Sequence, residues 1–164
     1  MNSLFGSFIN IKLKNMDITL SVKQSEVFKE VAQTTSYTGA KMNDDTSAYE
    51  RISTVDEDQS ELRRFWDESR AEVAQTFIRM LTSEGMDGDD YNLVLNVSVA
   101  FDTSLLPSMR LGLFSYFVQS IAAKWYVFTN KKEAGAFADV GKSILGEVKE
   151  KAFFKKKPTR PTYD

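Results

Sequence analysis

The chain has 164 residues, with 21 Lys and Arg against 23 Asp and Glu, and it contains neither cysteine nor histidine. This length fits one domain with its own core, while the missing residue types exclude disulfides, thiolate metal sites and histidine-based acid–base catalysis. The formal net charge is −2, so the chain as a whole is not strongly basic, as many nucleic-acid-binding domains are.

Charge is nonetheless distributed unevenly along the chain. Residues 43–90 are rich in Asp and Glu, whereas residues 149–160 are rich in Lys and Arg. Regions of opposite sign suit head-to-tail contacts between copies of one chain. The alternative is a pair of solvated patches that keep a monomer soluble.

Two short strands are expected near the N-terminus. Phe8–Leu13 and Ile18–Val22 alternate apolar and polar residues, and Lys14–Asp17 between them would close a hairpin. The first strand could instead be an arm that pairs with a neighbouring molecule. A short helix is expected over Ser25–Gln33. It should end in the segment Thr34–Gly39, because threonine is a poor helix residue and glycine suits a helix C-terminus.

The clearest helix is predicted to begin at a capping box, with Thr54 as N-cap and Glu57 three residues later, and to run to about Ser83. The Gly- and Asp-rich residues 84–90 would end it. An apolar face recurs along it at helical spacing. This face comprises Leu62, Phe65, Trp66, Ser69, Val73, Phe77, Met80 and Leu81.

One strand and two helices complete the predicted elements. Asn92–Asp102 alternates strictly and predicts a strand with one buried face. Pro107 suits the first position of a second long helix, and Thr129 is expected to cap a third. Because the join between these helices is short, they should form an antiparallel hairpin.

The second helix is apolar around nearly its whole circumference over residues 111–128. It therefore needs a second buried face, supplied by the acidic helix, the strand or another subunit. Arg110, Gln119 and Lys124 interrupt this segment, which falls short of the roughly 20 apolar residues of a membrane span. Residues 1–7 lack the features of a signal peptide. We expect a soluble protein without a membrane segment, in a reducing setting.

These elements predict an α-rich α+β domain over residues 1–152. It would contain three main amphipathic helices, including the C-terminal hairpin, one strong strand and the N-terminal hairpin if that forms. Residues 153–164 are predicted to be an extended basic arm, because Pro158 and Pro161 exclude a helix.

The acidic clusters offer little chemistry. A calcium-binding loop of the EF-hand type needs a glutamate at its twelfth position, and counted from Asp87 that position is Ser98. Asp56, Asp58 and Glu61 suit helix capping, although paired carboxylates could serve acid–base catalysis in a cleft. No phosphate-binding GxxxxGK[ST] motif occurs. We predict no enzyme, no cofactor and no metal site.

Three interpretations of the basic arm are possible. It could lie along the acidic surface of a neighbouring subunit with its aromatic residues as anchors, bind nucleic-acid phosphates, or be a solubilising tail. We favour the first over the second, and the solubilising tail stays an open alternative. The residues expected at a partner interface are aromatic residues of the second long helix together with aromatic and basic residues of the arm. They are Phe114, Phe117, Trp125, Tyr126, Phe153, Phe154, Lys155, Lys156, Lys157, Arg160 and Tyr163.

The order of elements and four short segments point to a known class of protein. The segments are Thr35–Lys41, Lys124–Tyr126, Thr129–Ala134 and Lys155–Pro161. Over residues 17–161 the chain resembles the head–tail connector proteins (adaptor or head-completion proteins) of tailed bacteriophages. Within that group it is most similar to small neck proteins of phages that infect gut Bacteroidetes.

This resemblance implies a structural virion protein made in the bacterial cytoplasm. Such proteins form a homo-oligomeric ring, commonly of twelve copies, in the neck between the portal protein and the tail. The helices would form the ring wall, terminal arms would reach the portal or neighbouring subunits, and DNA would pass through the lumen. The strong strand departs from the nearly all-helical adaptors. A stopper or tail-completion protein of the same neck is therefore an alternative, as is a nucleic-acid-binding protein that uses the arm.

Overall fold

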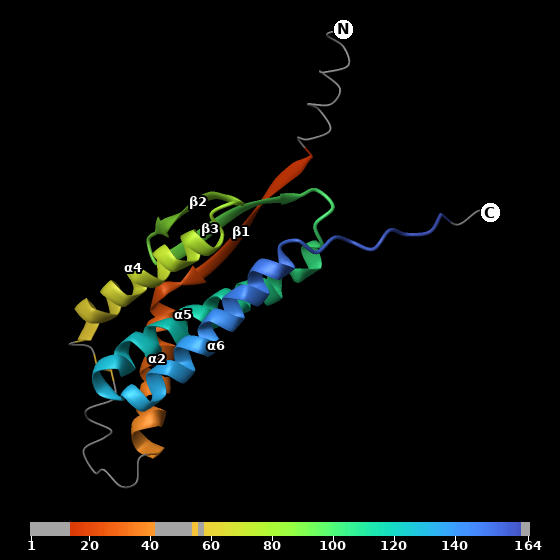
Figure 1. The fold of residues 1–164 in the computed structure, drawn as a ribbon. Helices are drawn as coiled ribbons and strands as arrows, with labels where there is room; N and C mark the ends of the chain where they lie inside the picture. Colours follow the sequence, from red (N-terminus) through yellow and green to blue (C-terminus); the bar gives the residue numbers. More distant parts are fainter. Residues whose placement is uncertain (1–13, 42–53, 56–57, 162–164) are drawn as a thin grey trace.

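The computed structural model describes residues 14–41, 54–55 and 58–161. In that part of the chain, four helices accompany a small antiparallel sheet, and α6 packs along α5 (Figure 1). The elements follow in the order β1 (Asn15–Lys23), α2 (Gln24–Lys41), α4 (Gln59–Thr76), β2 (Leu81–Asp87), β3 (Asp90–Ser98), the 3-10 helix η2 (Thr103–Leu105), α5 (Leu106–Thr129) and α6 (Lys131–Lys151). The structure confirms an α-rich domain with a minor β component.

The sheet has the strand order β1-β3-β2, so the predicted strong strand is its central member. β1 pairs with β3 from Asn15 opposite Ser98 to Lys23 opposite Asp90. Alternation places one set of side chains in the core. That set comprises Ile18, Leu20, Val22, Tyr91, Leu93, Leu95 and Val97. The opposite face is polar, and on it Ser21 donates to Asn92 over 2.6 Å. This alternation of apolar and polar side chains is typical of an antiparallel sheet with one face in the core and the other exposed to solvent.

The turn predicted at Lys14–Asp17 is wrong. Asn15, Met16 and Asp17 already belong to β1, and the Val99 amide donates to the Lys14 carbonyl over 3.2 Å. The pairing partner of β1 is β3, whose paired residues lie 67 (Lys23 and Asp90) to 83 (Asn15 and Ser98) positions away, since a long central strand offers a longer ladder than a local hairpin without glycine. Residues 8–13, the other half of the predicted hairpin, lie outside the described part.

The prediction that one helix runs to about Ser83 is also wrong. α4 ends at Thr76, and Leu81–Asp87 forms the strand β2. Met80 and Leu81 fit the 3.6-residue spacing of the helix face. In the structure they are half-buried and pack against the hydrophobic core without being helical. The run Thr76-Phe77-Ile78 consists of weak helix formers. Pairing of β2 with β3 therefore outweighs helix continuation.

α2 extends to Lys41 rather than ending in the segment Thr34–Gly39. The threonines are accommodated because their hydroxyls donate back to the preceding turn. Thr35 bonds the Val31 carbonyl over 2.9 Å and Thr38 bonds the Thr34 carbonyl over 3.0 Å. Tertiary packing of buried Val27, Val31 and Thr35 thus overrides the low helix propensity.

α5 is the central element of the fold. A proline occupies its first turn as predicted, and one residue, Asn130, separates it from α6. The two helices pack with opposite directions: Gly112 faces Val148, whereas Gly141 faces Gln119 and Ser120. α2, α4 and β1 cover other sides of α5. Most of its apolar circumference is therefore buried within the subunit, although Leu111 and Phe128 remain 66% and 73% exposed.

Candidate functional site

The basic arm leaves the domain at one end of the sheet. Lys155 forms an isolated antiparallel bridge with Phe101. On either side of it, the Asp102 amide donates to the Phe154 carbonyl over 3.0 Å and the Lys156 amide donates to the Ala100 carbonyl over 2.9 Å. The described residues after Lys156, up to Pro161, are exposed and belong to no helix or strand (Figure 1). The arm is thus fixed at its base and open along its length.

Two aromatic side chains mark the base of the arm. Phe153 and Phe154 are 64% and 52% exposed. With Asp102, Leu105 and the lysines that follow, they line an open groove on the surface. Exposed phenyl rings beside a run of lysines provide an apolar and cationic surface that suits a partner protein.

The opposite end of the sheet is acidic. Gly88, at φ +59°, allows the tight turn that connects Asp87 of β2 to Asp90 of β3. The Asp89 carboxylate accepts hydrogen bonds from the hydroxyl and the amide of Ser25, at 2.5 Å and 2.9 Å, and these bonds lower its pKa. Asp90 pairs with Lys23 over 3.1 Å, which raises the pKa of the lysine.

A hollow of about 260 Å³ lies beside this acidic turn. We call it the acidic hollow, and it is lined by Ser21, Val22, Lys23, Glu26, Asp90 and Phe114. Phe114 is half-buried and projects from α5, while Glu26 belongs to the first turn of α2. The acidic hollow therefore combines an aromatic wall with carboxylates.

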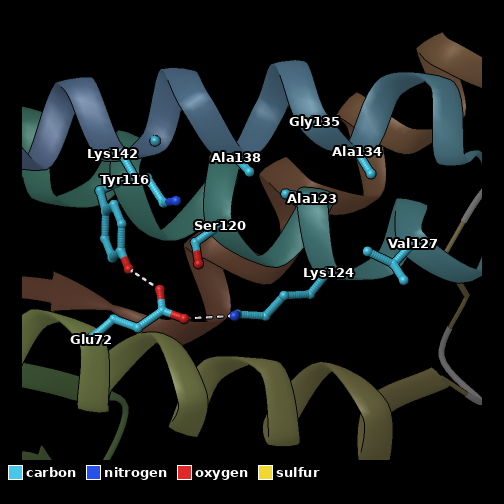
Figure 2. Close-up of a pocket in the computed structure, with 11 residues that line it drawn as sticks. Glu72, Tyr116, Ser120, Ala123, Lys124, Val127, Ala134, Gly135, Ala138 and Lys142 are labelled. Atoms are coloured by element: carbon cyan, nitrogen blue, oxygen red, sulfur yellow. Dashed lines mark hydrogen bonds and ion pairs between the residues drawn. The ribbon is translucent and has the colours of Figure 1, made fainter.

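A second hollow, of about 350 Å³, opens between α5 and α6 (Figure 2). Its walls are small apolar residues, among them Ala123, Ala134 and Ala138. Figure 2 shows Tyr116, Ser120 and Lys124 of α5 turned toward Glu72 of α4 at the floor. Figure 2 also shows Lys142 of α6 at the edge.

The polar floor of this hollow is a connected network. Glu72 accepts from the Tyr116 hydroxyl over 2.5 Å and from the Lys124 ammonium over 2.7 Å. The hydroxyls of Ser69 and Ser120 lie 2.7 Å apart. Burial acts to raise the pKa of Glu72, but the hydrogen bonds from Lys124 and Tyr116 outweigh it and the pKa is lowered. Burial, followed by the bond to Glu72, raises the pKa of Tyr116.

These charge states favour a structural role for the network. At neutral pH, Glu72 is ionised with both carboxylate oxygens engaged, and Tyr116 is a neutral donor. A general base needs an available lone pair and a pKa near the working pH. Since the pKa of Glu72 is lowered rather than raised toward neutrality, the network is better suited to joining α4 to α5 than to acid–base chemistry.

Sequence reasoning did not single out this network, although a signal was present. Tyr116, Ser120 and Lys124 recur every four residues on a largely apolar helix, so they form one polar stripe. Ser69 and Glu72 are spaced by three on α4 and face that stripe. Because Ser69 lies on the buried face of α4, polar residues next to that face and on α5 predict that the two helices meet there.

The residues predicted for a partner interface fall into three groups. Phe117 and Tyr126 are fully buried in the subunit, where Phe117 stacks on Trp66 at 4.3 Å and the Tyr126 hydroxyl donates to Thr38 over 2.8 Å. Phe114 and Trp125 are half-buried. The arm residues are exposed, namely Phe153, Phe154, Lys155, Lys156, Lys157 and Arg160. Tyr163 lies outside the described residues. The exposed arm, rather than the centre of α5, is thus the surface available to a partner.

The carboxylates considered for catalysis are used locally. Asp58 accepts from the Val55 amide over 2.7 Å. Glu61 is exposed, and a hydrogen bond from Ser60 lowers its pKa. Asp56 lies outside the described residues. Across the described chain, no cluster of three or more acidic side chains has the geometry of a metal site.

Among residues 14–41, 54–55 and 58–161, no helix combines the length and apolar character needed to cross a bilayer. Comparison of the chain with protein-family models, with curated proteins and with solved structures gives no match.

Proposed function

We propose that this protein is a structural, non-enzymatic subunit of a homo-oligomeric ring in the neck of a tailed phage, similar to a head–tail connector that joins portal and tail. The observation that carries the proposal is the placement of opposite charge at opposite ends of the sheet. The basic arm leaves beside Phe101, and the acidic turn lies at Asp87–Asp90.

The separation of these two ends favours contacts between different copies. β3 spans eight residue steps from Asp90 to Ser98, which is about 26 Å at the usual rise of a strand. Two different patches on one molecule that attract each other generate a head-to-tail contact, and such contacts close into rings when the rotation between copies allows it.

The composition of the arm also supports an assembly role. Phe153 and Phe154 provide exposed apolar anchors, and the lysines beside them provide orientation by charge. In the proposed ring, the α5–α6 pair lies in the wall, the arm contacts the portal or a neighbouring copy, and DNA passes through the lumen.

The size of the particle tests this proposal. Mass photometry and cryo-EM of the protein, alone and mixed with the portal protein of the same phage, should detect rings of many copies. The double variant Lys156→Glu, Lys157→Glu should weaken assembly, whereas Lys131→Glu, Lys132→Glu on α6 should not. A protein that stays monomeric both alone and with the portal contradicts the proposal.

The three-stranded sheet favours a second position in the same neck, since stoppers and tail-completion proteins commonly contain β-structure. A cryo-EM map of the assembled neck would assign the position. The lysines of the arm favour a further candidate, a nucleic-acid-binding protein. That candidate requires affinity for DNA or RNA that falls steeply with salt and is lost on deletion of residues 153–164.

A further inference from the structure

We infer that the acidic hollow is the docking site for the basic arm of a second copy of this chain, with Lys157–Pro161 as the bound segment. This inference rests on the proposed ring and deepens it, because it names the two surfaces that meet.

The charges of the two surfaces are complementary. Two carboxylates, Glu26 and Asp90, line the acidic hollow, and its one lining cation, Lys23, already pairs with Asp90. Asp87 and Asp89 belong to the same acidic turn as Asp90, and Asp89 accepts hydrogen bonds from Ser25. The docking segment of the arm carries Lys157 and Arg160, and no acidic residue occurs between Lys151 and Pro161. Complementary potentials of this kind orient a contact and exclude wrong partners.

The apolar groups of the two surfaces also match. An extended polyproline II segment has three residues per turn, so Pro158 and Pro161 share one face, and Lys157 and Arg160 share another. Proline-rich segments dock on aromatic walls. Phe114 provides such a wall, and Leu111, one turn earlier on α5, is 66% exposed. Prolines can therefore contact Phe114 while the basic face meets the carboxylates.

The arm of the same chain cannot reach this hollow. Lys156 is fixed to Ala100 at the far end of the sheet, about 26 Å or more from Asp90. The four residue steps from Lys156 to Arg160 extend only about 12 Å as polyproline II. The arm that fills the acidic hollow must therefore come from another copy, in a head-to-tail contact.

The larger hollow between α5 and α6 is a poorer acceptor for the arm. Lys124 and Lys142 line it, and its one acidic residue, Glu72, is already bonded to Lys124 and Tyr116. A second cationic segment would meet repulsion there rather than a free carboxylate.

Disulfide cross-linking tests the contact directly, because the natural chain has no cysteine. One tagged variant carries Thr159→Cys in the arm, and a differently tagged variant carries Ser21→Cys in the acidic hollow. The control is Ser143→Cys, an exposed position on α6. After mild oxidation of the mixed variants, we expect about tenfold more heterodimer with Ser21→Cys than with Ser143→Cys, since docking raises the effective concentration of the two thiols.

A charge exchange then separates docking from random collision. Adding Glu26→Lys to the Ser21→Cys variant should reduce the heterodimer to the level of the control, and adding Lys157→Glu to the arm variant should restore it. Glu147→Lys on α6 should have no effect. Circular dichroism and thermal unfolding establish that each variant is folded.

Equal cross-linking at Ser21→Cys and Ser143→Cys, or no response to Glu26→Lys, overturns the inference. If rings form with the portal while cross-linking stays at the control level, docking in the acidic hollow is wrong and the proposed function stands. If the protein also stays monomeric in both settings, both proposals fail.

Discussion

Tyr116 of α5 donates a hydrogen bond to Glu72 of α4 over 2.5 Å, and these two residues are 44 positions apart in the sequence. Lys124, two turns further along α5, holds the other carboxylate oxygen at 2.7 Å. One carboxylate thus joins two helices at two points. The adjacent hydroxyls of Ser69 and Ser120 complete a polar seam between helices that are otherwise joined by apolar packing.

Acid should weaken this seam. The pKa of Glu72 lies below its ordinary value of 4.5 because the hydrogen bonds from Lys124 and Tyr116 outweigh the opposing effect of burial. A carboxyl with a lowered pKa in the folded state stabilises the protein above the unfolded pKa, and that contribution is lost as pH falls through the folded pKa. We expect the free energy of unfolding to decline below about pH 4.5.

The variant Glu72→Gln isolates this contribution. It should be less stable than the natural protein at pH 7 and should show a flatter pH dependence between pH 3 and 5 in urea denaturation. Glu147→Gln, which changes an exposed carboxylate on α6, serves as the control. Parallel pH profiles for the natural protein and Glu72→Gln would refute the assignment.

The protein should also lose stability in alkali. Burial is the main cause that raises the pKa of Tyr116, Tyr91 and Tyr126 above the ordinary value of 10.0. A phenol whose pKa is raised by folding stabilises the protein fully below pH 10, and the stabilisation is lost as pH rises through the folded pKa. We expect ultraviolet difference absorbance to show these tyrosines ionising together with unfolding. Ionisation near pH 10 with unchanged circular dichroism would contradict this expectation.

Tyr116→Phe provides a second measure of the same seam. Loss of its hydrogen bond to partly exposed Glu72 should cost about 1–2 kcal/mol at neutral pH, and the variant should lose less stability above pH 10. Urea denaturation of the natural protein and of Tyr116→Phe, at pH 7 and above pH 10, measures both effects.

The elements that could be predicted from sequence are those with one strong local signal. The proline predicted in the first turn of α5 is there. The alternation predicted over Asn92–Asp102 marks a real strand, but that strand is Asp90–Ser98, and Val99 beyond it is 52% exposed. The end of α4 could not be predicted, because Met80 and Leu81 satisfy the helix spacing as well as the packing beneath β2. Only the pairing of β2 with β3, which places Leu81 opposite Leu95, decides between the two outcomes.

The candidate site also has one part that could be predicted from sequence and one that could not. The arm could be predicted, because its prolines exclude a helix and its lysines make it basic whatever the rest of the chain does. The acidic hollow forms where β1, α2, β3 and α5 come together. No residue pattern in the sequence predicts that these four elements are neighbours. Phe117 and Tyr126 were assigned to a surface because α5 has too many apolar residues for one neighbour, whereas the fold provides α2, α4, α6 and β1 as neighbours.

Thr35 should be essential for anchoring the segment that precedes α4. Its hydroxyl is fully buried, accepts from the Thr54 amide over 3.1 Å and donates to the Val31 carbonyl. Thr35→Val keeps the shape but leaves a buried amide without this acceptor, which should cost about 1–3 kcal/mol. Amide hydrogen exchange should be faster at Thr54 in the variant. Thr76→Val, where the hydroxyl bonds only to its own helix at Glu72, is the control. Equal effects of the two substitutions would contradict this role.

The close approach of α5 and α6 depends on Gly112. A Cβ atom at this position would lie 2.6 Å from Cγ2 of Val148, a buried side chain too short to move aside. Gly112→Ala should therefore destabilise the protein by about 1–3 kcal/mol through overpacking. Gly146 sits on α6 with open space where its Cβ would be, so Gly146→Ala should stabilise by up to about 1 kcal/mol, because alanine is the better helix residue. Urea denaturation of both variants tests the pair. If Gly112→Ala is as stable as Gly146→Ala, the helices have room to separate, and the glycine does not set their distance.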